Sequence, residues 1–192
     1  QLFYSGKWKK SKSGYNLIKR RPDNSKTIAT YSIPTETEID KGLTTSNFAQ
    51  KIWQKKSRKF KFDFLIKVAN YINKNRHEFA KLESFEVGKK YKDALLEIEH
   101  SVELWKYAAS QVNSHKDELY ENLSQEVTAK VIREPIGTVA VITPWNFPMI
   151  VLSERVPFIL AAGCSVVIKP SEHASASILK LADFFRNEKK LS

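Results

Sequence analysis

Two short runs of β-branched residues constrain this chain more than any other feature. The first run spans Thr138 to Thr143 and the second spans Ser165 to Lys169, and each ends in a polar loop. Near-continuous apolar runs of this length are typical of strands buried in a parallel sheet. Helical patterns follow both runs, at 148–162 and 175–186, so the two strands should be parallel. The sequence therefore predicts an α/β fold, and such sheets bind ligands at the carboxyl ends of their strands.

The first 113 residues predict short strands followed by helices. Strand-like runs lie at residues 2–4, 15–18 and 27–31. A helix should begin near Thr35, because Thr35 and Glu38 have the spacing of a capping box. Further helices carry apolar residues at helical spacing, which we expect to face the core. These residues are Ile39, Leu43, Phe48, Ile52, Trp53, Phe60, Phe64, Val68, Ile72, Phe79, Leu82, Phe85, Leu95, Ile98, Val102, Trp105 and Ala109.

The pattern changes after Asn113 and divides the chain into three predicted parts. Residues 126–133 alternate as in a strand that is exposed on one side. We assign residues 1–113 to amino-terminal strands and helices, 114–135 to a strand or hairpin, and 136–192 to two βα units.

Composition and spacing argue against several classes of protein. The net charge of +11 suggests a polyanion partner, but only seven of the 32 basic residues are arginine, the residue suited to bidentate phosphate contacts. No apolar run is long and uncharged enough to span a membrane. The single cysteine, Cys164, excludes an internal disulfide and favours a reducing, cytoplasmic setting. The four histidines are isolated, so we predict no metal site.

Polar side chains follow both predicted strands and are the candidates for chemistry. Asn146 lies between rigid residues, where its side-chain amide can stabilise an oxyanion. Spacing alone favours a simpler role, in which Asn146 caps the following helix. Lys169 and Glu172 can hydrogen-bond the paired hydroxyls of a sugar, or they can form a surface ion pair.

Several motifs, in their order and spacing, resemble the amino-terminal part of the NAD(P)-dependent aldehyde dehydrogenase superfamily. They are Glu-x-Gly-Lys at 86–89, Pro-x-Gly at 135–137, Pro-Trp-Asn-Phe-Pro at 144–148, Ala-Ala-Gly at 161–163 and Lys-Pro-Ser-Glu at 169–172. The resemblance implies a partial Rossmann-like parallel sheet, a helical bundle with short strands before it, and an oligomerisation strand within 114–135.

The same resemblance implies roles for individual residues. Asn146 matches the asparagine that stabilises the oxyanion of the thiohemiacetal. The implied cofactor-binding residues are Ile142, Thr143, Pro144, Trp145, Asn146, Lys169, Ser171 and Glu172. Of these, Lys169 and Glu172 match the positions that contact the adenosine ribose. A carboxylate such as Glu172 accepts a bond from the ribose 2′-hydroxyl and repels a 2′-phosphate, which favours NAD over NADP.

The family's catalytic cysteine and general-base glutamate have no counterpart before Ser192. Cys164 follows an Ala-Ala-Gly helix end and is predicted to be an inert core residue. We therefore expect the amino-terminal portion of an aldehyde dehydrogenase that is inactive alone and pairs with itself or with a chain carrying the catalytic half. The alternatives are a non-catalytic binding or assembly module and, more remotely, a basic nucleic-acid-binding protein.

Overall fold

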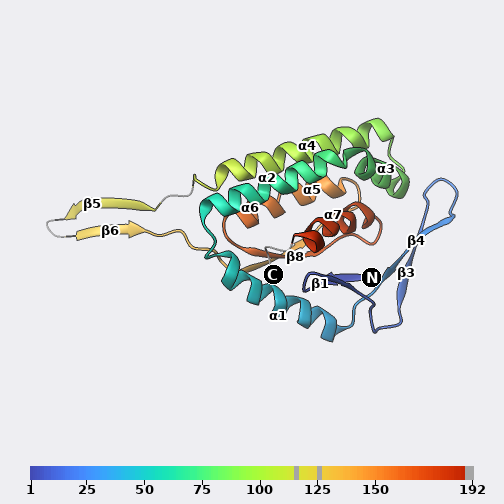
Figure 1. Cartoon of the computed structure of the whole chain (residues 1–192), viewed down its shortest axis with the longest axis horizontal. Coiled ribbons are helices and arrows are strands. Elements are labelled where there is room, and N and C mark those ends of the chain that lie inside the picture. The colour runs from blue at the N-terminus through green and yellow to red at the C-terminus, as the bar shows by residue number, and fades with distance from the viewer. Residues whose placement is uncertain (115–116, 125–126, 189–192) are drawn as a thin grey trace.

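The protein is a mixed α/β structure in which helices surround one pair of parallel strands (Figure 1). The structure is a computed structural model that describes residues 1–114, 117–124 and 127–188. The helices are α1 (Glu36–Trp53), α2 (Arg58–Lys74), α3 (Arg76–Val87), α4 (Tyr91–Gln111), α5 (Pro148–Ser153), α6 (Val156–Ala161) and α7 (Ala176–Asn187). The strands are β1 (Leu2–Tyr4), β2 (Lys7–Lys9), β3 (Asn16–Arg20), β4 (Thr27–Ser32), β5 (Glu118–Ser124), β6 (Val127–Val131), β7 (Thr138–Ile142) and β8 (Ser165–Lys169).

The parallel pair confirms the central prediction from the sequence. β7 and β8 align in parallel, with Thr138 opposite Ser165 and Ile142 opposite Lys169. One face of the pair packs on the core through residues such as Val141. Helix α1 covers the amino end of the other face, where Ser165 hydrogen-bonds Ser46 at 3.0 Å. The carboxyl end of that face stays open, and Ile142 is 71% exposed there.

The crossover between these strands differs from the single helix predicted for residues 148–162. It forms two short helices, α5 and α6, that break at Glu154–Arg155. Pro157 lies in the first turn of α6 and has no amide hydrogen to continue the hydrogen bonding of α5. Helix α7 begins one residue after the predicted position and runs to Asn187.

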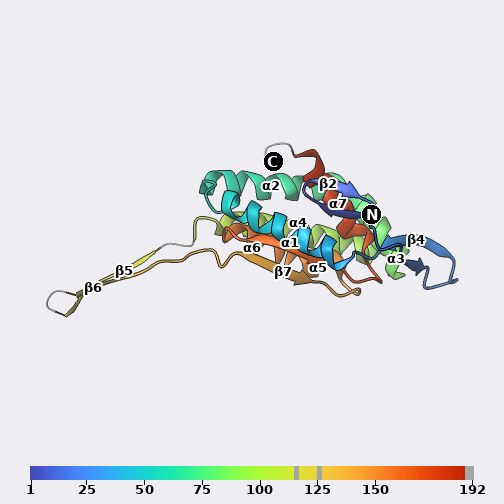
Figure 2. The ribbon, with the colours of Figure 1, turned by 90° about the horizontal axis from the view of Figure 1, so that it is seen from below.

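Helices α2 and α4 lie side by side over the crossover helices and make the two largest contributions to the core (Figures 1 and 2). Trp105 on α4 is fully buried, and its indole nitrogen donates to Ser153 Oγ on α5 at 3.0 Å. Trp53 at the end of α1 donates likewise to the carbonyl of Leu160 at 3.0 Å. Buried indoles carry a polar atom that needs a partner, so these bonds fix how the helices meet.

Helix α1 confirms one prediction and corrects another. Thr35 and Glu38 form the capping box that their spacing predicts. The apolar residues expected to face the core are, however, largely exposed: Ile39, Leu43, Phe48 and Ile52. The helix is held by its other side, where Gln50 donates to the carbonyl of Gly163 at 3.0 Å and accepts from the amide of Ser165. Phe85 on α3 is also exposed, at 46%, against the same prediction.

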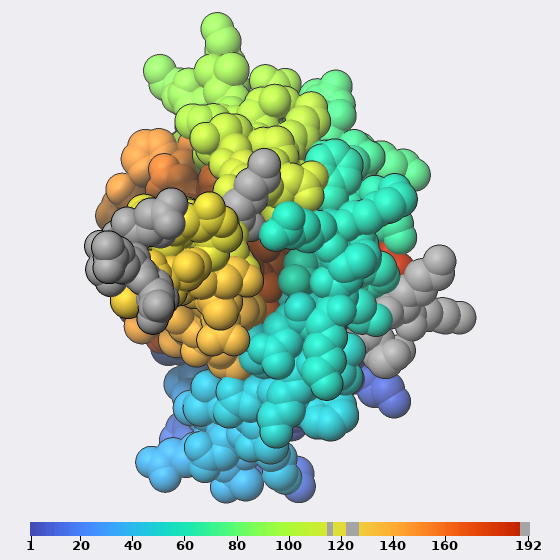
Figure 3. Space-filling model, turned by 90° about the vertical axis from the view of Figure 1, so that its left-hand side faces the viewer, coloured from blue at the N-terminus to red at the C-terminus, as the bar shows by residue number. Residues whose placement is uncertain are grey.

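The strands outside the parallel pair form antiparallel hairpins. β1 pairs with β2, which the sequence pattern does not predict, and β3 pairs with β4. β5 and β6 form a hairpin that projects far from the body (Figures 1 and 2). Seen from that side, the yellow hairpin stands in front of the packed helices (Figure 3).

This projecting hairpin differs from the predicted strand with one exposed side. Four of the five residues of β6 are exposed, because no third layer packs on either face of the hairpin in the described part of the chain. Glu126, where the predicted strand begins, lies outside the described residues.

No helix in the part of the chain that the structure describes is both long and apolar enough to cross a membrane.

Candidate functional site

The candidate site lies at the carboxyl ends of β7 and β8. Ile142 and Lys169 are register partners on these strands, and the amide of Thr143 donates to the carbonyl of Lys169 at 3.3 Å. The loops 143–147 and 170–175 therefore start side by side. The structure brings together the two groups of residues that the sequence singles out.

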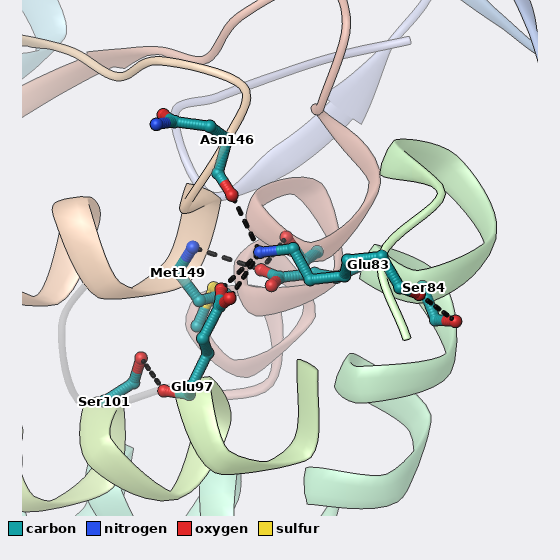
Figure 4. Close-up of polar contacts among 8 residues, drawn as sticks. Glu83, Ser84, Glu97, Ser101, Asn146 and Met149 are labelled. Carbon is teal, nitrogen blue, oxygen red and sulfur yellow. Dashed lines mark hydrogen bonds and ion pairs between the residues drawn. The ribbon is translucent and has the colours of Figure 1, made fainter. Parts of the chain in front are cut away.

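Asn146 is exposed, and its side chain points away from the packed helices (Figure 4). Its backbone carbonyl accepts a hydrogen bond from Lys89 Nζ at 2.7 Å. The prediction that Asn146 caps the next helix is wrong, because the cap position of α5 is Phe147 and no side chain caps it from there. The side-chain amide of Asn146 makes no hydrogen bond within the described residues, so both of its protons are available to a ligand.

A carboxylate from α3 takes the place of that cap. Glu83 Oε1 accepts from the amide of Met149 at 3.1 Å and from Ser177 Oγ at 3.0 Å (Figure 4). The side chain is buried, and its second oxygen has no partner within the described residues. Burial raises the pKa of Glu83 to about 7, and the nearby Lys89 opposes that rise.

Glu86, one helical turn further along α3, caps the amino end of α7 with its carboxylate. Its carboxylate accepts from the amides of Ser175 at 3.2 Å and Ala176 at 2.8 Å, and from the hydroxyl of Tyr31. Burial, and then the bond to Glu86, raise the pKa of Tyr31. Two carboxylates on one helix thus occupy the amino ends of α5 and α7, where anions bind favourably.

Sequence reasoning missed these contacts. Glu86 and Lys89 fall within the Glu-x-Gly-Lys motif, but that motif alone assigns them no role. The available signal was two glutamates three residues apart on a helix with apolar neighbours. Such a pattern is usually read as a solvent-exposed face.

Of the predicted ribose-binding residues, Lys169 is the last residue of β8 and Glu172 lies on the β8–α7 loop. Lys169 Nζ is 3.7 Å from Glu172 Oε2, and both side chains are exposed. A hydrogen bond from its own backbone amide, and then Lys169, lower the pKa of Glu172. The surface pair that the sequence allowed is therefore present, and it still offers one donor and one acceptor to solvent.

The remaining predicted residues divide into exposed and buried ones. Ile142, Pro144 and Trp145 are exposed at the strand end. Thr143 is buried, and its hydroxyl has no partner within the described residues. Ser171 is buried as well, and its hydroxyl accepts from the amide of His173 at 3.2 Å. The hydroxyl of Ser171 therefore serves the turn, whereas that of Thr143 is unpaired.

The structure also locates the residues predicted to carry no chemistry. Cys164 is buried, at 4% exposure, which confirms the prediction of a core cysteine. His77 Nδ1 lies 2.7 Å from the hydroxyl of Tyr91, and His115 falls outside the described residues. Among the described residues, no three metal-ligating side chains gather into a possible metal site. A surface hollow of about 380 Å³ involves Trp8, Tyr31 and Asp183 and lies apart from the strand-end residues.

Comparisons with known proteins show which family this chain resembles. The aldehyde dehydrogenase family model matches residues 8–189. Malonate-semialdehyde dehydrogenase of Halalkalibacterium halodurans is 30% identical over 95% of this chain, and mitochondrial succinate-semialdehyde dehydrogenase of Oryza sativa is 28% identical over 95%. The match covers 38% and 35% of those two proteins, respectively.

Solved structures show the same fold. An NAD-dependent aldehyde dehydrogenase from Sinorhizobium meliloti superposes with a TM-score of 0.92 at 34% identity, over 97% of this chain and 38% of that one. An NADP-dependent enzyme from E. coli superposes with a TM-score of 0.93 at 25% identity, over 96% and 38%. The relatives therefore include users of either dinucleotide. Because the family model matches nearly the whole sequence, this chain belongs to the aldehyde dehydrogenase family.

Proposed function

We propose that these 192 residues are the amino-terminal portion of an NAD-dependent aldehyde dehydrogenase, which oxidises an aldehyde to a carboxylic acid. The observation that carries the proposal is Asn146, whose carbonyl is held by Lys89 while its amide faces outward at the end of β7. A neutral amide in that position stabilises negative charge that develops on a carbonyl oxygen during attack. This chain contributes the donor, and the nucleophile has to come from other residues.

The cofactor side of the proposal rests on the loop after β8. Lys169 and Glu172 would bind the adenosine ribose, and bound NAD would accept the hydride. Ile142, Pro144 and Trp145 would line the nearby cofactor surface, and the buried Thr143 would lie behind them at the same strand end. Glu172 favours NAD, because an exposed carboxylate repels a 2′-phosphate. The capped amino end of α7 supports no pyrophosphate site there, since Glu86 already occupies it.

Residues 1–113 and 136–192 would belong to a Rossmann-like cofactor-binding domain, and residues 114–135 would form an oligomerisation hairpin. The single buried cysteine fits a reducing, cytoplasmic setting. No observation on the described residues favours a nucleic-acid partner over ordinary surface lysines.

We expect the isolated chain to form a dimer or a larger species. The β5–β6 hairpin presents free strand edges and exposed apolar side chains, including Leu119, and such edges recruit further strands. Light scattering at several concentrations measures the mass, and Leu119→Lys should lower it. Leu96→Lys, an exposed site on α4, is the matched control. A constant monomer mass for the unaltered chain would contradict the assignment.

The activity is tested by complementation. The chain alone should reduce no NAD in the presence of an aldehyde, because its one thiol is buried and covalent catalysis needs an accessible thiolate. Mixed with the separately expressed remainder of the Sinorhizobium meliloti enzyme, it should restore NAD reduction. Cys164→Ala should leave the restored activity unchanged. Turnover by the chain alone, or a stable complex that binds NAD without turnover, would refute the proposal.

A further inference from the structure

We propose that Lys89 is a positioning residue: with Glu97, it holds the backbone carbonyl of Asn146 and so aims the Asn146 amide out of its loop. The catalytic consequence of this inference rests on the proposed function. The positioning itself does not, because it can be measured on the isolated chain.

The ammonium group of Lys89 contacts acceptors from two segments, helix α4 and the β7–α5 loop. Its Nζ lies 2.5 Å from both carboxylate oxygens of Glu97 on α4 and 2.7 Å from the carbonyl of Asn146. It also lies 4.7 Å from the centre of the Phe147 ring, within the range of a cation–π contact. Glu83 on α3 is also close to this centre, because the charges of Lys89 and Glu97 both act on its pKa. One cation, carried by the turn between α3 and α4, therefore joins α4 to the β7–α5 loop.

Two features hold Lys89 itself in place. Gly88 ends α3 in the left-handed conformation, with φ of 83°, and turns the chain toward α4. A Cβ at Gly88 would lie 3.3 Å from Pro22, so the turn also packs closely. Ser84 Oγ then donates to the carbonyl of Lys89 at 2.8 Å (Figure 4). The side chain of Lys89 therefore extends from a fixed backbone, as is needed for a residue that positions another one.

The shielding of this centre distinguishes it from an ordinary surface ion pair. The side chains of Lys89 and Glu97 are only 14% and 10% exposed. Exposed pairs contribute little, but a shielded pair that loses one partner leaves a desolvated charge behind. Loss of Lys89 would therefore remove the hydrogen bond to the Asn146 carbonyl and leave the shielded carboxylate of Glu97 without its ion-pair partner.

The test compares Lys89→Met with Lys92→Met, a matched change at an exposed lysine on α4. Hydrogen exchange reports the loop through the amides of Met149 and Val151, which bond to Glu83 and to the Phe147 carbonyl. In Lys89→Met their exchange should accelerate about tenfold or more, the effect expected for a lost charged hydrogen bond. The amide of Val68, buried in α2, should stay protected and so excludes global unfolding.

A spectroscopic readout follows Asn146 directly. Its side-chain amide signals, identified by their absence in Asn146→Ala, should sharpen toward those of a mobile asparagine in Lys89→Met. Lys89→Arg should recover part of the rigidity, because a guanidinium can still bind Glu97. Glu97→Gln should loosen the loop through the same contact.

The outcomes separate this inference from the proposed function. If the loop loosens in Lys89→Met but Asn146→Ala leaves complemented turnover intact, positioning holds and the proposed function fails. If Asn146→Ala abolishes turnover while Lys89→Met changes neither the exchange nor the Asn146 signals, positioning is overturned. Where both hold, Lys89→Met should lower kcat and leave KM for NAD unchanged.

Discussion

Asn146→Ala should lower kcat of the complemented enzyme about 100- to 1,000-fold, the usual cost of removing one oxyanion donor. The side-chain amide makes no hydrogen bond within the described residues, and the carbonyl bonded by Lys89 is backbone. Truncation at Cβ therefore removes the donor and keeps the contact that positions the loop. The far-ultraviolet spectrum and the mass of the complex should not change.

Two comparisons make this result specific. Asn146→Asp keeps the shape but replaces donors with a negative charge, so turnover should fall at least as far. Asn16→Ala, at an exposed position on β3, should leave kcat unchanged. If Asn146→Ala keeps the wild-type kcat, the amide has no role in the chemistry.

Glu83→Gln should change how the stability of the chain depends on pH. The pKa of Glu83 is about 7 in the folded protein and near 4.5 when unfolded, so the folded state retains a proton through that window. The stabilising contribution of Glu83 to the free energy of unfolding is complete below about pH 4.5 and is lost as the pH rises through 7. The loss amounts to about 3 kcal/mol, because each pKa unit is about 1.4 kcal/mol.

Glutamine keeps the acceptor for Met149 and Ser177 but never ionises. Relative to the unaltered chain, Glu83→Gln should therefore gain about 3 kcal/mol between pH 4.5 and pH 8. Urea unfolding at a series of pH values measures the difference. Glu134→Gln, at an exposed loop position, should show no such trend. A stability difference for Glu83→Gln that does not vary with pH would show that this carboxyl ionises normally in the fold.

Much of the framework could be predicted from local sequence. The capping box at Thr35 and the two parallel strands depend on neighbouring residues, so their patterns are sufficient. The exposed face of α1 could not be predicted, because helical spacing shows that a face is apolar but not what covers it. The break before Pro157 was missed although the proline is visible, since the first turn of a helix tolerates it.

The contacts that hold the candidate site in place could not be predicted either, because they join residues far apart in the sequence. Glu83 contacts Met149 and Glu86 contacts Ser175, at separations of 66 and 89 residues. Burial of a glutamate depends on amides that only the folded chain supplies. Asn146 could be named as a candidate because it follows a predicted strand, but its contact Lys89 lies 57 residues away in the sequence.

The placement of Glu83 and Glu86 has a mechanical consequence. Two glutamates on one turn of α3 accept hydrogen bonds from the first residues of two helices that follow different strands. Helix α5 donates through Met149, and helix α7 through Ser175 and Ala176. As long as these hydrogen bonds hold, a shift of α3 is expected to move the amino ends of α5 and α7 together. The distance between the amino ends of α5 and α7 therefore depends on the rise of one helical turn of α3, the turn that separates Glu83 from Glu86.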